Sequence, residues 1–383
     1  MIENTDFFTY DTLTWPEVAA LPREIPLVIP LGEGYAFDQL AEALGTPPRA
    51  GILPPVPYGW AGSMLALPEP LLGAMMDNLA EGLREDGFDH VYALVPPGID
   101  LGLGISSISL PCQPGASPAM LEDAGRGKVV VLPVGHTEQH GLHLPLSTDT
   151  LIIEAIARGT SQAVPHQSIS LPAMPYGASM HRSSFAGTLN VGGRAFEDFW
   201  LGVVDALVSR GFDRFYLISG HGGNCSFLVN VVKYAGERHR RIFCATAWLY
   251  LSGPQGIHAL QERRRSSLGG MGHACELETA LMLHLRPELV HMDRVMDEVD
   301  FIATESYYMD WVEGGALVAN PPWDDDTLTG AYGAGSLATA ENGQFWLQAA
   351  IAEKVSHIRE IHEQHNRREE RRRSGYGLWG KRR

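Results

Sequence analysis

Five side chains that can bind a metal ion lie within nineteen residues, in the stretch VLPVGHTEQHGLHLPLSTD from Val131 to Asp149. They are three histidines, a glutamate and an aspartate in otherwise apolar chain: His136, Glu138, His140, His143 and Asp149. Glu138 and His140 are two residues apart, so in extended chain both side chains point the same way. Mixed imidazole and carboxylate ligation favours Zn, Mn or Fe over Ca or Mg. The stretch therefore predicts a divalent metal site.

A further imidazole stands in the loop SGHGGN, where glycines let the backbone turn sharply around His221. We expect Glu138, His140, Asp149 and His221 to hold one or two ions per subunit. Zinc is the first candidate, and manganese and iron are the alternatives. Taken alone, Asp149 could instead cap the helix that follows it.

Three other histidines are expected to have non-ligand roles. His136 lies in a tight turn and is predicted to be an exposed neighbour of the site. His143 is a further candidate from the same stretch, and His181, in YGASMHRSSFAGT, is predicted to line the substrate pocket.

The segment HACELETALMLHL, residues 273–285, places polar groups in a predicted apolar helix. On such a helix, His273 and Glu276 are three residues apart and share a face. Glu278 is five residues from His273 and is expected to point elsewhere. Buried polar groups need partners, so a hydrogen-bond network is one interpretation. The other makes His273 a general acid/base and Glu276 a metal ligand or the support of one.

Alternating strand and helix patterns surround these residues. Strands are predicted at 127–134, 212–219 and 241–248, and helices at 149–159, 196–211, 225–240 and 273–285. Glycines are expected to stop two of the helices, at Gly159 and Gly211. The alternation predicts an α/β fold with a mostly parallel sheet. Ligands in such sheets bind beyond the carboxyl ends of strands, where GHTEQHG and GHGGN both fall.

Residues 10–100 are predicted to be a shortened copy of residues 115–230. VIPLGEGY, LPPVPYG and LREDGFDHVYALVPPG match VLPVGHTE, LPAMPYG and LVSRGFDRFYLISGHG in the same order. Tyr35, Phe37 and Pro97 stand where Glu138, His140 and His221 stand in the second copy, so the first copy is expected to bind no metal. We divide the chain into a metal-free half-repeat (1–108), a catalytic domain (109–365) and a basic tail (366–383), with a Pro/Gly/Ser-rich linker at 109–127.

Composition narrows the possible partners. The 383 residues carry a net charge of −16, which argues against nucleic acid as a partner. No apolar run is long enough for a membrane helix, and no Lys/Arg-led apolar stretch opens the chain, so a secretory signal is not expected. Four widely spaced cysteines form no CxxC pair, which is typical of a reduced, cytoplasmic protein. With nucleic acid and membrane excluded as partners, a small molecule is the expected substrate.

Four motifs together resemble the creatininase (creatinine amidohydrolase) family: LPVGHTEQHGLHLPLSTD, SGHGGN, HACELETALMLHLRPELV and TGAYGAGSLATAENG. The resemblance spans roughly residues 110–355. It implies a layered α/β/α fold, a two-metal centre, hydrolysis of carbon–nitrogen bonds and a homo-oligomer. By motif, Glu138 and His221 would bind one metal and His140 the other, Asp149 would bridge them, and His273 would be the catalytic histidine.

Two departures from the family pattern matter. Creatininase has a glutamate ligand two residues after the loop histidine, where this chain has Gly223, so creatinine is not the expected substrate. The family pattern is also a single domain, without the extra first copy. The expected function is metal-dependent hydrolysis of an amide, cyclic amide or formamide bond. The alternatives are a metal-dependent hydrolase of a C–C or ester bond, and a non-catalytic protein that binds a metabolite or acts as a scaffold.

Overall fold

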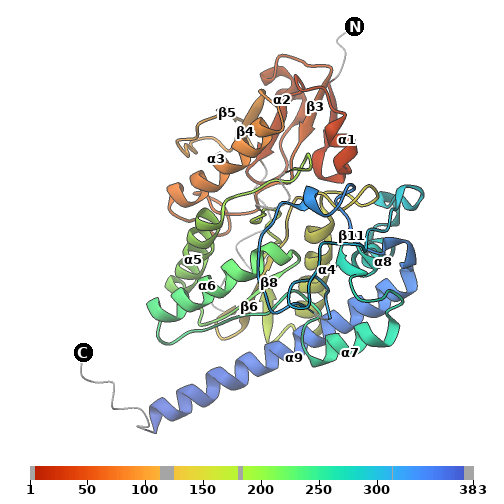
Figure 1. The fold of residues 1–383 in the computed structure, drawn as a ribbon. Coiled ribbons are helices and arrows are strands. Elements are labelled where there is room, and N and C mark those ends of the chain that lie inside the picture. The colour runs from red at the N-terminus through yellow and green to blue at the C-terminus, as the bar shows by residue number, and fades with distance from the viewer. Residues whose placement is uncertain (1–4, 113–124, 180–183, 313, 375–383) are drawn as a thin grey trace.

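Two parallel sheets follow one another along the chain (Figure 1). The computed structural model describes residues 5–112, 125–179, 184–312 and 314–374. The first sheet has the order β1-β3-β2-β4-β5: Asp6–Thr9, Arg49–Ile52, Leu27–Pro30, Val91–Val95 and Ser106–Ser109. The second has the order β7-β6-β8-β9: Ser168–Ser170, Val129–Val134, Arg214–Ser219 and Phe243–Thr246. A short antiparallel pair joins β10 (Met271–His273) to β11 (Tyr332–Gly333). The predicted α/β fold with mostly parallel sheets is confirmed.

The α-helices of the first half are α1 (Trp15–Ala19), α2 (Phe37–Ala43) and α3 (Glu69–Glu85). Those of the second half are α4 (Thr148–Ala163), α5 (Gly193–Ser209), α6 (Gly222–Arg238), α7 (Pro254–Arg263), α8 (Glu276–Leu285) and α9 (Ala340–Arg373). None of these described helices has the length and apolarity needed to cross a membrane.

Strand β6 shows how the sheet separates two hydrophobic cores. Val130, Leu132 and Val134 enter a core that includes residues of α3 and α5. Val129 and Val131 point the opposite way, into a core with α4, α8 and α9. This alternation is what a strand covered by helices on both faces requires. The sheet therefore lies between two helical layers, and its carboxyl edge remains available for functional side chains.

The first sheet faces the same core as the second. Leu27 and Ile29 of β2 belong to the cluster that contains Val130 and Leu132 of β6. On its other face, β2 places Val28 in a small separate cluster with Leu40 of α2. The two halves of the chain are thus joined by one continuous apolar interior.

The two sheets also share their order and part of their backbone hydrogen bonding. The order β3-β2-β4-β5 repeats as β7-β6-β8-β9. The segments LPPVPYG (53–59) and LPAMPYG (171–177) form equivalent hydrogen bonds with the neighbouring chain. Leu53 N donates to Val28 O at 2.9 Å, as Leu171 N does to Val131 O at 3.0 Å. Gly32 N donates to Val56 O at 2.9 Å, as Gly135 N does to Met174 O at 2.8 Å. In the first sheet, the Tyr35 hydroxyl donates to Leu31 O at 2.6 Å, beyond the end of β2.

One predicted helix end was wrong. Helix α4 continues to Ala163 instead of stopping at Gly159. A Cβ at Gly159 would lie 2.4 Å from Ile351 Cδ1 of α9, so the glycine allows close helix packing. The basic segment from residue 366 is helical as far as Arg373, as part of α9, and Arg367 pairs with Glu363 at 2.6 Å. Most of the predicted linker lies outside the described residues.

Candidate metal centre

The four expected ligands meet at the carboxyl ends of β6 and β8. Glu138 and His140 lie in the loop after β6, Asp149 lies in the first turn of α4, and His221 is the residue that caps α6. Their exposed fractions are between 0 and 2%. Such burial of ionisable groups is costly unless each is paired or binds a metal.

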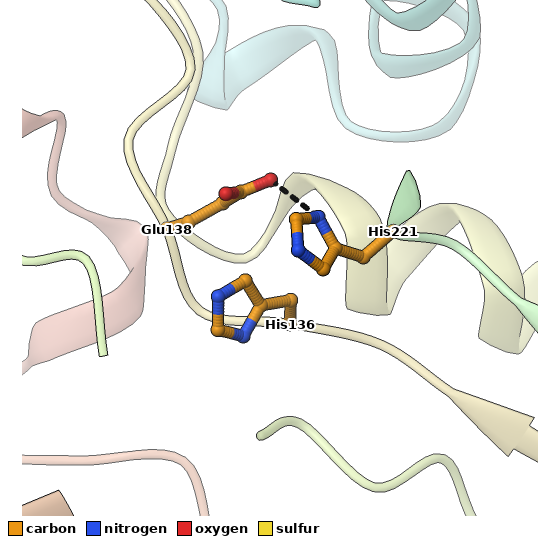
Figure 2. A group of neighbouring side chains, drawn as sticks. All are labelled: His136, Glu138 and His221. Carbon is orange, nitrogen blue, oxygen red and sulfur yellow. Dashed lines mark ion pairs between the residues drawn. The ribbon is translucent and has the colours of Figure 1, made fainter. Parts of the chain in front are cut away.

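Asp149 lies between the two imidazoles. Its Oδ1 is 3.1 Å from His140 Nε2, and its Oδ2 is 3.4 Å from His221 Nδ1. His221 Nδ1 is also 2.8 Å from Glu138 Oε1, the ion pair drawn in Figure 2. Asp149 Oδ2 accepts no hydrogen bond from the described residues. The carboxylate thus faces both histidines, as a bridging ligand would.

Backbone carbonyls orient three imidazoles of the centre. The nitrogens that face carbonyls are His140 Nδ1 (Glu138 O, 3.1 Å), His221 Nε2 (Ala178 O, 3.1 Å) and His273 Nε2 (Gln139 O, 2.7 Å). Because a carbonyl oxygen only accepts, each of these nitrogens carries the hydrogen. In a neutral ring, the other nitrogen then offers its lone pair towards the carboxylates, as in metal-binding histidines. The donor set and the orphaned Asp149 oxygen therefore fit a divalent ion.

Carboxylates dominate the electrostatics of the site. Burial lowers the pKa of His140, but Asp149, Glu278 and Glu138 together raise it to about 9. Burial also opposes charge on His221, and Glu138 and Asp149 raise its pKa to about 9. The site therefore favours positive charge, supplied by protons or by a metal ion.

This balance predicts opposite pH trends for the two forms of the protein. Raised histidine pKa values stabilise the metal-free fold fully below about 6.5, the unfolded value, and that contribution is lost as the pH rises through 9. The loss should be on the order of a few kcal/mol. Metal binding must displace these protons, so the stabilisation by metal should grow over the same range. Urea denaturation from pH 6.5 to 9.5, in chelator and again with metal, gives the free energy of unfolding of both forms. If the two free energies change with pH in the same way, the assignment is contradicted.

His273 lies at the centre, but not on the expected helix. It ends β10, and α8 begins three residues later at Glu276. Ala274 between them has a positive φ of 50°. His273 and Glu276 therefore share no helix face, and that expectation was wrong. His273 Nδ1 lies 3.9 Å from Glu138 Oε1, and its ring meets Trp323 edge-on at 5.0 Å between centroids.

The two glutamates of α8, Glu276 and Glu278, lie differently from expectation. Glu276 accepts backbone N–H groups from Arg265 (3.0 Å) and Ser266 (2.8 Å) and joins no group of metal-capable atoms in the described chain. Glu278 forms such a group with His140 and Asp149, with all three candidate ligand atoms within 4.8 Å of one another. Glu276, predicted to be a ligand, therefore lies outside these groups, and Glu278 lies within one.

The other histidines differ in their outcomes. His136 is fully buried, not exposed, and groups with Glu138 and His221 (Figure 2). Its Nδ1 accepts the Gly177 N–H at 2.9 Å. His143 is buried, and its Nε2 lies 2.9 Å from Thr279 Oγ1. His181 lies outside the described residues.

Gly223 has no room for a side chain. A Cβ there would lie 2.4 Å from His221 Nε2 and 2.5 Å from Ala178 O, the two atoms of one hydrogen bond. A glutamate at this position is incompatible with the observed placement of His221. Glu278 brings a carboxylate to the His140 side of the centre instead.

Gly223→Ala should weaken metal binding by about 10- to 100-fold, the usual cost of disturbing the group that orients a metal-binding histidine. Gly236→Ala is the matched control, because Gly236 lies on the same helix and a Cβ there would meet nothing within 4 Å. The control should bind metal normally and gain slight helix stability. Equilibrium dialysis with elemental analysis measures both, and equal affinities would refute the steric argument.

An aromatic cluster closes the site on the His273 side. Phe185, Trp323 and Tyr332 form its buried part, and Trp15 of the first half packs against it. Trp15 meets Phe185 at 5.4 Å between centroids, and its Nε1–H donates to Thr329 O at 2.8 Å. The first half also holds the ligand loop, because Ser147 N donates to Asp11 O at 3.0 Å, two residues before Asp149. Residues of both halves therefore shape the site.

The fold and the site define an α/β protein with a buried, carboxylate-rich metal centre at a sheet edge. The sequence pattern of the creatininase family, described as creatinine amidohydrolase, matches residues 116–358. The chain belongs to the creatininase family.

Relatives with named activities match less than half of the chain. The mycofactocin precursor peptide peptidase of Mycobacterium ulcerans (strain Agy99) is 33% identical over 174 residues, 43% of this chain and 62% of that protein. The creatinine amidohydrolase of Pseudomonas putida is 29% identical over 182 residues, 44% of this chain and 68% of that protein. The match thus spans less than two thirds of the peptidase.

A solved structure agrees in fold. The structure described as creatininase Mn has a TM-score of 0.50 and 25% sequence identity. It covers 63% of this chain, and 93% of that chain is matched. The expected creatininase-type fold is confirmed.

Proposed function

We propose that the protein is a metal-dependent amidohydrolase that cleaves a carbon–nitrogen bond in a small molecule. The observation that carries the proposal is the buried set of Glu138, His140, Asp149 and His221, held at one sheet edge with lone pairs and carboxylates facing one another. Glu278 adds a carboxylate beside His140 and Asp149.

A divalent ion bound by these residues would activate water and polarise the carbonyl of the substrate. Hydrolysis forms one C–O bond, breaks the C–N bond and delivers one proton to the leaving nitrogen. We assign that transfer to His273, whose Nε2–H is held by Gln139 O, leaving Nδ1 to accept and return the proton.

Zinc is the ion we propose first, with manganese or iron as alternatives and one or two ions per subunit. Imidazole and carboxylate ligands suit all three ions. Similar structures include proteins described as creatininase Mn and as a Zn-Zn type creatininase.

We further propose that residues 1–108 are a metal-free copy of the fold that buttresses the centre. The shared strand order and the matching hydrogen bonds support this. Among the described residues of this half, no three metal-capable side chains approach one another closely enough to bind an ion.

A cytoplasmic location and a homo-oligomer also belong to the proposal. Ile302, Val318 and Leu328, close in sequence to the aromatic cluster, are 69, 96 and 87% exposed. Large apolar side chains that are exposed in one subunit can be covered by contact with another. Light scattering of the purified protein measures the subunit number.

The test of the proposed function combines metal analysis with a substrate panel. Protein stripped by chelator and reloaded with Zn or Mn is assayed against N-formyl compounds, lactams and short peptides, with esters as the comparison. At least one amide should be hydrolysed, and the activity should vanish with the metal and return with it. Protein that binds no metal, or that cleaves esters alone, would overturn the proposal.

A further inference from the structure

His136 differs from the other imidazoles of the centre in the backbone group that it faces. His140, His221 and His273 each face a backbone carbonyl and carry a hydrogen on the nitrogen that faces it. His136 Nδ1 instead accepts the N–H of Gly177 at 2.9 Å. Because a backbone N–H only donates, Nδ1 carries no hydrogen, and the hydrogen of the neutral ring lies on Nε2.

Adjacent peptide groups set opposite roles for His136 and His221. Gly177 donates its N–H to His136, and the carbonyl of the next residue, Ala178, accepts from His221 Nε2 at 3.1 Å. This segment is held in place, because Ala178 N donates to Asn224 Oδ1 at 2.9 Å. In the neutral rings, His221 is thus left with a lone pair for the site, whereas His136 is left with an N–H donor.

His136 is fully buried beside two of the expected ligands. One of its ring nitrogens, a carboxylate oxygen of Glu138 and a ring nitrogen of His221 all lie within 4.8 Å of one another. The rings of His136 and His221 are 4.4 Å apart between centroids. In Figure 2, Nε2 lies on the side of the His136 ring that is nearer to Glu138. Of the two neighbours, Glu138 offers the acceptor, because His221 Nε2 donates its own hydrogen to Ala178 O.

The position of the hydrogen argues against His136 as a ligand. A metal-binding histidine offers a lone pair to the ion and donates its other N–H to a neighbouring acceptor. His136 has the reverse arrangement, so ligation through Nε2 would require the ring to lose its only hydrogen on nitrogen. An N–H donor beside a ligating carboxylate instead fixes the orientation of that carboxylate. The broad terminal torsion of the Glu138 side chain lets an oxygen turn towards the donor.

We propose that His136 is a positioning residue of the metal centre and not a ligand. Its Nε2–H holds the Glu138 carboxylate in the orientation that binds the ion. The inference rests on the metal site of the proposed function, but not on its substrate. It separates His136 from His221, although both belong to one group of metal-capable atoms.

His136→Gln and His136→Leu test this by equilibrium dialysis with Zn or Mn. Glutamine keeps an oxygen that can accept the Gly177 N–H and an N–H that can donate to Glu138. His136→Gln should therefore bind the ion with an affinity close to that of the wild type. Leucine has neither group, so His136→Leu should bind it about 10- to 100-fold more weakly, the usual cost of removing a partner of a metal ligand.

His221→Gln and His143→Leu are the matched controls. His221 Nδ1 faces Glu138 and Asp149 as a ligand would, so His221→Gln should lose metal far more completely than His136→Gln. His143 is equally buried but belongs to no group of metal-capable atoms in the described chain, so His143→Leu should bind metal as the wild type does. Thermal unfolding in chelator shows whether each variant is folded.

Cobalt gives a second readout, because its visible absorption reports the ligands around the ion. The spectrum of Co²⁺ bound to His136→Gln should keep the wild-type form, since the ligand set is unchanged. The spectrum of His221→Gln should differ. If His136→Leu does not fold, this comparison decides: a changed spectrum in His136→Gln overturns the inference, and an unchanged one supports it.

The remaining outcomes are distinct. Loss of metal from His136→Gln as complete as from His221→Gln makes His136 a ligand and overturns the inference. Wild-type affinity in a folded His136→Leu also overturns it, and leaves the proposed function standing. Equal weakening in His143→Leu overturns it as well, because the effect would then be one of general packing. A wild-type protein that binds neither Zn nor Mn overturns the inference together with the proposed function.

Discussion

Asp149→Ala should remove the bound metal more completely than other single substitutions at the centre. Its two carboxylate oxygens face different histidines, Oδ1 towards His140 and Oδ2 towards His221. Losing it therefore damages both halves of a two-ion site. Because disturbing the groups behind a ligand already costs about 10- to 100-fold in metal affinity, loss of the bridge should exceed that range. Hydrolysis should fall to background. Elemental analysis after dialysis gives the metal content.

His143→Ala is the control for this substitution. His143 is equally buried and comes from the same loop, but its Nε2 bonds to Thr279 Oγ1 and it belongs to no group of metal-capable atoms in the described chain. The variant should keep its metal, although the lost packing lowers its stability. Equal retention in the two variants would refute the ligand assignment.

His273→Ala should lose turnover by about 100- to 10,000-fold, the usual contribution of a general acid/base, while it keeps its metal and its fold. The imidazole is suited to proton transfer because Gln139 O fixes one nitrogen and Trp323 meets the ring edge-on. Single-turnover kinetics on metal-loaded protein isolates the chemical step. Parallel metal analysis shows whether the ions remain.

His221→Ala provides the comparison, since His221 pairs with both Glu138 and Asp149. If His273→Ala loses metal as completely as His221→Ala, His273 is a ligand and the proposed proton transfer is wrong. The comparison is needed because His273 also groups with Glu138 and His140 within 4.8 Å.

The convergence of four of the expected ligands could be predicted from sequence for a physical reason. Glu138, His140 and Asp149 fall within one stretch of twelve residues in the chain after β6, and His221 is the second residue after the neighbouring strand β8. In a parallel sheet, the carboxyl ends of neighbouring strands lie at the same edge. Their meeting point therefore follows from strand assignment alone.

The α8 side of the site could not be predicted in the same way. Helix α8 begins at Glu276, after a positive φ at Ala274 that the residue type does not reveal. The sequence pattern therefore places the start of the helix at His273, three residues too early. Because of this shift of three residues, the sequence pointed to Glu276, whereas Glu278 is the glutamate that groups with His140 and Asp149. The burial of His136 was missed because a turn at a sheet edge resembles an exposed turn in sequence. Here the surrounding segments cover it.

The shared apolar interior has a consequence for how the protein comes apart. Side chains of β2 and β6 fill the same space, so neither sheet can lose its structure without uncovering the inner face of the other. The chain should therefore melt as a single cooperative unit despite its internal repeat. A fragment that holds the metal ligands but lacks the first half would expose a large apolar surface to water and aggregate. Folding of the second half should therefore require the first half to be present in the same chain.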